Sequence, residues 1–271
     1  MPVALFISPH LDDVAFSCGG TFATLAQAGW HCVLLTVFTR SVPHPTGFAL
    51  ACQIDKGLGP EVNYLALRRA EDTAAARHLG ATTVRWLNLP EAPHRGYHSP
   101  AALFADLLPA DDIGPALTTL LAATLAETSP QVVFAPQGLG LHVDHRQVMQ
   151  AVRATVPAPV PVLWYRDTPY IIRQPEAQPA SELPAGLTEV ALPLSEAALA
   201  AKIAASQAYT SQIGFQFGGA EQVRSKLTQL AAVEGQAAGL GQVAARFAGH
   251  PALVGALPGS VAAGPRRAAE R

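Results

Sequence analysis

The stretch VALFISPHLDD (residues 3–13) joins a run of apolar residues to a cluster of polar side chains that can bind metals or transfer protons. Its first five residues are continuously apolar and rich in branched or aromatic side chains, a pattern typical of a strand buried on both faces. The polar cluster therefore follows the carboxyl end of a predicted strand. In an open α/β sheet the carboxyl ends of the strands face one crevice, where ligands bind.

A second polar cluster, HVDH (residues 142–145), lies in a Gly-rich loop that follows another apolar run, residues 132–135. It occupies the same kind of position as the first cluster, between a predicted strand and a predicted helix. Both clusters are therefore expected on one rim of the sheet. Histidines and carboxylates brought together there indicate a zinc site, and a zinc site with a spare carboxylate is typical of a hydrolase.

The alternation of short apolar runs with helical segments of about 10–15 residues predicts right-handed βαβ units. We therefore expect an α/β fold with a Rossmann-like, mostly parallel sheet and helices on both faces. The predicted strands span residues 3–7, 31–39, 84–89, 132–135 and 160–165. The predicted helices span residues 14–27, 67–79 and 116–127, and another begins near His145; residues 41–60 and 90–100, rich in Pro and Gly, are predicted loops.

The pattern changes after Tyr165. An outer strand is predicted over residues 187–194, followed by helices over residues 195–209 and 220–234, the second ending at Gly235. We interpret this part as an extension of the same sheet, so that residues 1–257 form one domain with a core (1–165) and an extension (166–257). Residues 258–271, rich in Ala, Gly and Arg, are expected to be a flexible tail.

The composition excludes several classes of function. Of the 271 residues, 49% are hydrophobic and 14% charged, and the net charge is -2, so no basic surface for nucleic acid is expected. The apolar runs are too short to cross a bilayer, and the N-terminus does not resemble a signal peptide. Three cysteines, an odd and sparse set, fit a reducing cytoplasm. We expect a cytoplasmic protein that acts on a small molecule; a homo-oligomer is compatible with the sequence.

The residue types and spacing in the two clusters suggest how a metal would be held. His10 and Asp13 are three residues apart at the start of a predicted helix, so their side chains can turn toward a common point. His145 can supply a third ligand. Two histidines and one carboxylate with an open fourth position form the ligand set of a catalytic zinc, although iron(II) could use the same ligands. Asp12 is then free to act as a general base.

His142 and Asp144 are the remaining candidates for catalysis. As an imidazolium or as a neutral donor, His142 could stabilise the oxyanion of a tetrahedral intermediate and protonate a leaving amine. Asp144 could hold the His142 ring in the useful tautomer. The alternative for the first cluster is structural, because Asp12 or Asp13 could cap the following helix. Capping explains neither the number of histidines nor their placement, so we favour the metal interpretation.

Both clusters resemble the motifs of the LmbE-like, or PIG-L, zinc-dependent N-deacetylases, which act on N-acetylglucosaminyl conjugates and related sugars. The family's first motif, Pro/Ala-His-Pro-Asp-Asp-Glu, is similar to residues 9–14, and its second, His-x-Asp-His-Arg, to residues 142–146. The resemblance implies a Rossmann-like fold with zinc on His10, Asp13 and His145. It also implies Asp12 as the base and His142, oriented by Asp144, at the oxyanion and leaving group.

The resemblance extends over most of the chain, through residues 68–71 and 79–80 and the C-terminal residues around 202–212. Two positions depart from the first motif: Leu11 stands where Pro is usual, and Val14 stands where Glu is usual. Neither replaces a ligand or the base. They suggest a subgroup whose substrate differs from the better-known sugar conjugates.

Four residues are candidates for substrate contacts. Arg68 either forms a surface ion pair with Glu71, at helical i, i+3 spacing, or points into the crevice to bind a hydroxyl or an anionic group. Glu91, Arg95 and Tyr97 follow the third predicted strand, on the same rim. The alternative for these three is an ordinary polar loop.

The leading hypothesis is therefore a zinc hydrolase that removes the N-acetyl group of an amino-sugar conjugate. An enzyme with the same machinery could instead cleave a different amide, such as that of an acylated natural product. A non-hydrolytic nucleotide-binding module is less compatible, because the first turn contains Ser-Pro-His instead of a Gly-rich phosphate loop. A metal-binding protein that has lost activity would not be expected to keep Asp12.

Overall fold

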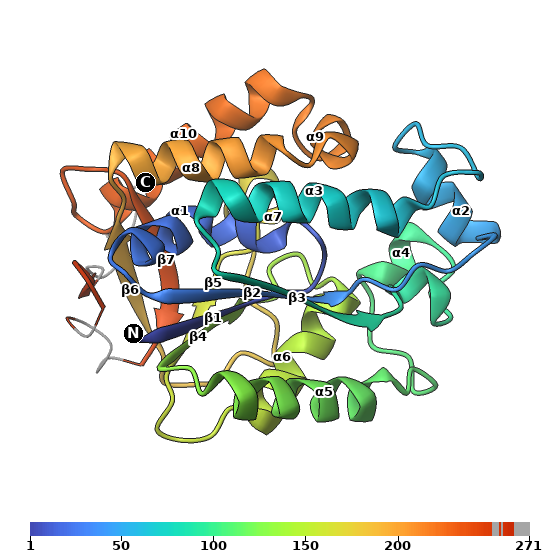
Figure 1. The fold of residues 1–271 in the computed structure, drawn as a ribbon, viewed down its shortest axis with the longest axis horizontal. Helices are drawn as coiled ribbons and strands as arrows, with labels where there is room; N and C mark the ends of the chain where they lie inside the picture. Colours follow the sequence, from blue (N-terminus) through green and yellow to red (C-terminus); the bar gives the residue numbers. More distant parts are fainter. Residues whose placement is uncertain (251–254, 256, 263–271) are drawn as a thin grey trace.

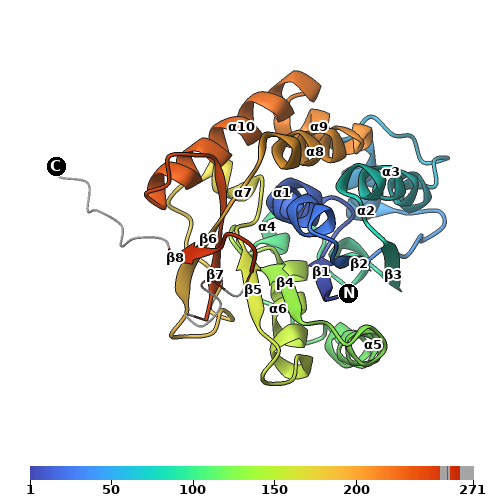
Figure 2. The same ribbon diagram turned by 60° about the vertical axis from the view of Figure 1, so that its left-hand side comes forward.

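The computed structural model describes residues 1–250, 255 and 257–262, which form one mixed eight-stranded sheet with helices on both faces (Figures 1 and 2). The strand order is β3-β2-β1-β4-β5-β7-β6-β8. The first five strands are parallel: β1 (Val3–Ser8), β2 (His31–Phe38), β3 (Thr83–Leu89), β4 (Val132–Pro136) and β5 (Val162–Tyr165). The last three, β6 (Thr188–Pro193), β7 (Ala244–Gly249) and β8 (Val261–Ala262), pair antiparallel. The expected Rossmann-like, mostly parallel α/β fold is confirmed.

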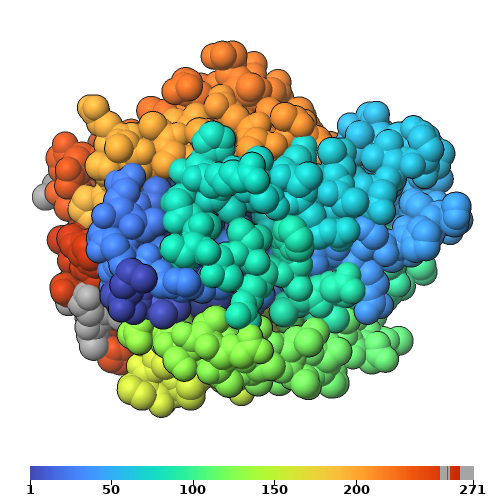
Figure 3. Space-filling view, viewed as in Figure 1, coloured from blue at the N-terminus to red at the C-terminus, as the bar shows by residue number. Residues whose placement is uncertain are grey.

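The helices form a layer on each face of the sheet. One layer contains α1 (Asp13–Gln27), α3 (Tyr64–Leu79), α8 (Glu196–Gln207) and α10 (Ala220–Ala237), and the other contains α5 (Ile113–Thr128) and α6 (Val143–Thr155). Figure 3 shows the surface in the view of Figure 1, with the teal atoms of the segment around α3 above the green atoms of the segment around α5. The short helices are α2 (Gly47–Ile54), η1 (Ala92–His94), α4 (Pro100–Leu103), α7 (Tyr170–Arg173) and α9 (Thr210–Phe217).

Strand β1 shows why a continuous apolar run marks a central strand. Its alternate side chains enter two separate hydrophobic clusters: Ala4 and Phe6 pack on the α1 side, and Leu5 and Ile7 pack on the α5 side. Because both faces are covered by helices, neither set of positions can be polar. The ring of Phe6 stacks on that of Phe134 of β4, with centroids 4.2 Å apart. This packing fixes β1 against β4 at the centre of the molecule.

The position of β1 also determines where a ligand can bind. The chain proceeds from β1 outward to β2 and β3, and β4 then pairs with the opposite side of β1. The strand order therefore reverses between β1 and β4, which is where open α/β sheets bind ligands at the carboxyl ends of their strands. The two polar clusters of the sequence follow these two strands directly.

Several elements differ from those expected. The predicted loop over residues 41–60 contains helix α2, and β7 and α9 were not predicted at all. The segment that forms β7 reads AARFAG, and its small residues give no clear strand pattern. The strand predicted as outermost, β6, lies between β7 and β8. Of the predicted flexible tail, residues 258–262 contain β8, and residues 263–271 lie outside the described part of the chain. No helix among the described residues is both long and apolar enough to span a membrane.

Gly235 does not end the last helix as predicted; it lies inside α10. A Cβ atom at this position would lie 2.0 Å from the main-chain oxygen of Gln242, in the segment that leads into β7. The glycine is therefore required for the close approach of α10 to the segment that leads into β7. Gly214 in α9 provides a contrast, because a Cβ there would meet no atom within 4 Å.

We expect Gly235→Ala to destabilise the protein by about 1–3 kcal/mol, because main-chain atoms must move to accept the methyl group. Gly214→Ala should be neutral or stabilising by up to about 1 kcal/mol, since alanine favours the helix. Urea denaturation of both variants measures the difference in free energy of unfolding. Equal stabilities would contradict the packing role of Gly235.

Candidate metal centre and active site

In the turn after β1, neither Asp12 nor Asp13 caps helix α1 with its side chain. The Ser8 hydroxyl donates to the carbonyl oxygen of His10 at 2.6 Å and accepts from the main-chain N–H of Val14 at 3.1 Å. The Asp12 side chain makes no capping hydrogen bond to α1. The Asp13 carboxylate accepts from the main-chain N–H of His10, at 2.7 Å. The capping alternative is therefore wrong, and a serine performs that role.

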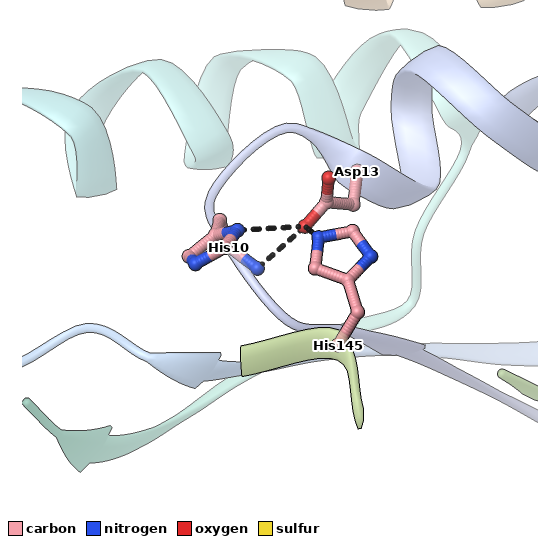
Figure 4. Close-up of side chains that lie close together, drawn as sticks. All are labelled: His10, Asp13 and His145. Atoms are coloured by element: carbon pink, nitrogen blue, oxygen red, sulfur yellow. Dashed lines mark hydrogen bonds and ion pairs between the residues drawn. The ribbon is translucent and has the colours of Figure 1, made fainter. Parts of the chain in front are cut away.

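The three predicted metal ligands converge on one point (Figure 4). Oδ2 of Asp13 lies 3.2 Å from Nδ1 of His10 and 3.4 Å from Nε2 of His145, which is on the first turn of α6. A tetrahedral zinc ion with bonds of about 2.0–2.2 Å holds its ligand atoms about 3.3–3.6 Å apart. The observed separations are close to this spacing.

His145 gives an independent indication that these residues fit a metal. Its Nε2 atom is buried, and within the described part of the chain it has no hydrogen-bond partner. A buried nitrogen without a partner is unfavourable unless something else binds it. The other ring nitrogen, Nδ1, is 2.6 Å from Oδ1 of Asp167. Such a contact fixes the ring and leaves Nε2 available as a ligand.

Asp167 is a functional residue that the sequence analysis missed. It follows the carboxyl end of β5, and its second oxygen, Oδ2, accepts from the main-chain N–H of Leu139 at 2.9 Å. Burial lowers the pKa of His145, but Asp13 and Asp167 outweigh it, so the pKa of this ring lies above its ordinary value. The signal available in the sequence was a carboxylate just beyond a predicted strand, on the same rim as the two motifs.

Asp144 does not hold the His142 ring through its carboxylate, as was predicted. Oδ2 of Asp144 lies 2.9 Å from Nε2 of His10, and Oδ1 accepts from Arg95 at 2.7 Å. The main-chain N–H of Asp144 donates to Nδ1 of His142 at 3.2 Å. Asp144 therefore orients a predicted ligand with its side chain and His142 with its backbone.

These contacts determine the charge states around His142. Because Nδ1 of His142 accepts a hydrogen bond, a neutral ring carries its proton on Nε2. Burial, with a further contribution from His10, lowers the pKa of His142 to about 3. Burial would raise the pKa of Asp144, but Arg95 and His10 hold it far below its ordinary value. His142 is thus a neutral donor beside an ionised aspartate. His10, His142 and Asp144 also form a second cluster of potential ligand atoms, although Arg95 already occupies one Asp144 oxygen.

Asp12 is buried beside the ligand cluster, and its carboxylate accepts from Nη2 of Arg68 at 3.1 Å. Burial raises the pKa of Asp12 to about 7, while Arg68 opposes the shift. The adjacent Asp13 behaves differently: burial would raise its pKa, but His145 and His10 lower it to about 2. Neighbouring carboxylates with such different pKa values are suited to different roles, one as a proton acceptor and one as a permanently charged ligand.

Arg68 points into the crevice and does not pair with Glu71. Its guanidinium donates to Glu91 and to the carbonyl oxygen of Leu11, both at 2.9 Å, as well as to Asp12. Glu71 instead accepts hydrogen bonds from Thr210 and Ser211 at the start of α9. The surface ion pair is therefore wrong. Arg68 and Glu91 lie beside the candidate base, and their contact with a substrate stays a prediction.

Arg95 and Tyr97 have structural partners that occupy their polar atoms. Arg95 forms a two-bond ion pair with Asp111, at 2.9 and 3.0 Å, in addition to its contact with Asp144. Tyr97 is 0% exposed, and its hydroxyl donates to Asp111 at 3.0 Å. The predicted substrate contact of Tyr97 does not agree with its full burial. Arg95 supports Asp144 and also lines a cavity with His94 and Asp111, so its contact with a substrate stays a prediction.

The two departures from the family motif also point away from the site. Leu11 and Val14 are buried in the hydrophobic cluster on the α1 side of the sheet. Their side chains are therefore not placed to contact a bound molecule, and the suggestion that they mark a subgroup with a different substrate stays a prediction. They are a packing variation beneath the first motif.

The fold and the site together define a Rossmann-like α/β protein with a candidate centre of two histidines and one aspartate at the switch point of its sheet. Residues 5–156 match the family "PIG-L: GlcNAc-PI de-N-acetylase", and the chain therefore belongs to the PIG-L family. The predicted resemblance is confirmed.

The chain is similar to two curated relatives. It is 36% identical over 167 residues to a 2'-N-acetylparomamine deacetylase of Streptomyces fradiae, covering 61% of this chain and 57% of that protein. It is 32% identical over 186 residues to a protein of the same name from Niallia circulans, covering 61% of this chain and 66% of that protein. The matches thus span somewhat less than two thirds of each relative's length. Among solved structures, a teicoplanin deacetylase in a zinc-inhibited form superimposes with a TM-score of 0.77 at 25% identity, covering 91% of this chain and 97% of that chain.

The contact between Asp167 and His145 leads to a prediction. Replacing Asp167 with Asn should weaken zinc binding by about 10- to 100-fold, because partners of a ligating histidine typically contribute this much to affinity. Competition titration with a zinc-binding dye measures the change. Asp106→Asn, the same substitution at a fully exposed carboxylate, is the matched control and should leave the affinity unchanged. An unaltered affinity in the Asp167 variant would show that His145 does not depend on this contact for binding.

Proposed function

We propose that this protein is a zinc-dependent hydrolase that removes the N-acetyl group from a small amino-sugar conjugate. The observation that carries the proposal is the convergence of His10, Asp13 and His145 at the switch point, where the buried Nε2 atom of His145 makes no hydrogen bond to any described residue. The family assignment and the names of the two curated relatives support an N-acetylated sugar as the substrate class.

Asp12 would act as the general base in this reaction. A zinc ion held by His10, Asp13 and His145 would polarise the amide carbonyl and favour ionisation of water. The Asp12 carboxylate takes the proton as the water oxygen attacks the acetyl carbon. Its pKa of about 7 suits transfer of a proton in both directions near neutral pH. When the carbon–nitrogen bond breaks, this proton passes to the nitrogen, and the products are acetate and a free amine.

His142 would stabilise the negative charge that develops on the carbonyl oxygen. Its Nε2–H is a neutral hydrogen-bond donor, oriented by the main-chain N–H of Asp144 at Nδ1. A donor fixed before the reaction begins stabilises an oxyanion without reorganisation. The low pKa of His142 favours this role over that of an imidazolium acid. Arg68 would hold the Asp12 carboxylate in place through its 3.1 Å contact.

The role of Asp12 can be separated from metal binding by Asp12→Asn. We expect this variant to keep one zinc per chain but to lose about 100- to 10,000-fold in kcat, because the proton acceptor is absent. Turnover is followed as acetate released from N-acetylglucosaminides and 2'-N-acetylparomamine, with metal content measured on the same samples. Parallel loss of metal and activity would identify Asp12 as a ligand and overturn the assignment. Inactivity of the zinc-loaded wild type on all N-acetylated sugars would instead rule out the substrate class.

Removal of the metal provides a second test. Dialysis against a chelator should abolish activity, and stoichiometric zinc should restore it. Adding iron(II) under anaerobic conditions instead would show whether that ion serves the same ligands. His145→Ala is expected to bind no zinc at stoichiometric concentration, because one of three protein ligands is lost. Activity that survives complete chelation would contradict the mechanism.

A further inference from the structure

Apolar and aromatic side chains lie beside His142, and we call Phe104, Tyr170 and Leu141 the apolar rim. Phe104, which follows α4, is 42% exposed, and its ring lies edge-on to His142, with centroids 5.4 Å apart and planes at 83°. The half-buried ring of Tyr170, on α7, lies 5.9 Å from Phe104 and 5.9 Å from His145. Ligand sites are lined mainly by apolar and aromatic side chains with a few polar groups among them, and this arrangement is of that kind.

The loop before His142 is shaped to form this rim. Gly140 has a positive φ of 86°, and a Cβ there would lie 2.6 Å from the Tyr170 ring. The absence of a side chain at Gly140 therefore allows Tyr170 to pack against the loop. Leu141 also has a positive φ, 64°, which is unfavourable for leucine, and its side chain is 42% exposed. The backbone is held so that an apolar side chain faces solvent directly before His142.

The solvent exposure of the side chains differs between the two histidines of the motif and the apolar rim. His145 is 0% exposed and His142 7%, whereas Phe104 is 42% exposed. An acetyl group has only a methyl group beyond its carbonyl carbon, so nearly all of a substrate's bulk lies on the side of the amide nitrogen. Phe104 is the most exposed of the aromatic rings around His142, and we take the group that it contacts to be this larger one.

We propose that Phe104, with Tyr170 and Leu141, forms the subsite for the ring that carries the amide nitrogen, and that Phe104 packs against the apolar C–H face of this ring. This inference rests on the proposed deacetylation, since the small size of the acetyl group leaves the larger group of the substrate to contact Phe104. A sugar or aminocyclitol ring fits the site, because it presents a C–H face to the aromatic ring while its hydroxyls remain available to polar groups such as Glu91. Phe104 is thus a specificity-determining residue, with no part in the bond-breaking step.

The test compares the zinc-loaded wild type with Phe104→Ala and Phe104→Leu. We expect Phe104→Ala to lower kcat/KM for N-acetylglucosaminides by about 10- to 100-fold, mainly through KM, as when binding common to ground and transition states is lost. Phe104→Leu, which keeps the bulk but not the aromatic face, should lose less. Leu120→Ala removes a half-exposed apolar side chain on the outer helix α5 and is the control, expected to match the wild type.

Two further measurements identify what the rim contacts. The ratio of activities on N-acetyl and N-butanoyl forms of one glucosaminide should be the same in wild type and Phe104→Ala; a shift toward the longer acyl chain would place the acyl group at Phe104 and overturn the proposal. Saturation-transfer NMR with methyl N-acetylglucosaminide measures binding without turnover. Binding that Phe104→Ala weakens supports the subsite even if the wild type is inactive, in which case only the proposed hydrolysis fails. Equal binding and equal KM in wild type and Phe104→Ala would also overturn the proposed subsite.

Discussion

The parallel pairing of β1 with β4 is the constraint on which the site depends. These strands are neighbours although the chain visits β2 and β3 between them, so the loops that follow β1 and β4 open into one crevice. His10 and Asp144, 134 positions apart in sequence, are consequently in contact at 2.9 Å. A single oxygen of Asp13 lies between His10, in the turn after β1, and His145, on the first turn of α6. The central packing of Phe6 on Phe134 therefore fixes the relative position of the two motifs.

Many charged groups are buried at the site, and each of them needs a partner of opposite charge. A buried charge without a partner is strongly unfavourable, and removal of one member of a buried pair is more damaging than replacement of both. Arg68 compensates Asp12, and Arg95 compensates Asp144, while the ion pair between Arg95 and Asp111 holds that guanidinium in turn. The pKa values of the adjacent carboxylates Asp12 and Asp13 differ because their partners differ. Asp12 contacts the guanidinium of Arg68, whereas Asp13 contacts the imidazoles of His10 and His145.

The sequence was sufficient to predict the groups that lie within short motifs, but not the groups that support them. His10 and Asp13 are three residues apart, so local spacing brings them together, and the position of His145 follows from the strand order. Asp167 contacts His145 from the segment after β5, and Arg95 contacts Asp144 across 49 positions in sequence. No local pattern in the sequence indicates either contact. The assignment of Asp144 to His142 was wrong for this reason: adjacency in sequence was taken for side-chain contact. The fold shows the same division, since the apolar strands were predicted, whereas β7, made mostly of small residues, is defined by its antiparallel pairing with β5 and β6.

Under the proposed function, the exposed loops are better placed than the two departures from the family motif to distinguish substrates. Leu11 and Val14 face the core, where a change alters packing first. The groups that face solvent at the rim, Phe104, Leu141 and Tyr170, come from three connections that follow β3, β4 and β5. Such connections tolerate changes in length and composition, because the sheet that positions the ligands does not depend on them. A chain built on this plan can keep the cluster of His10, Asp13 and His145 while the exposed apolar side chains around His142 change.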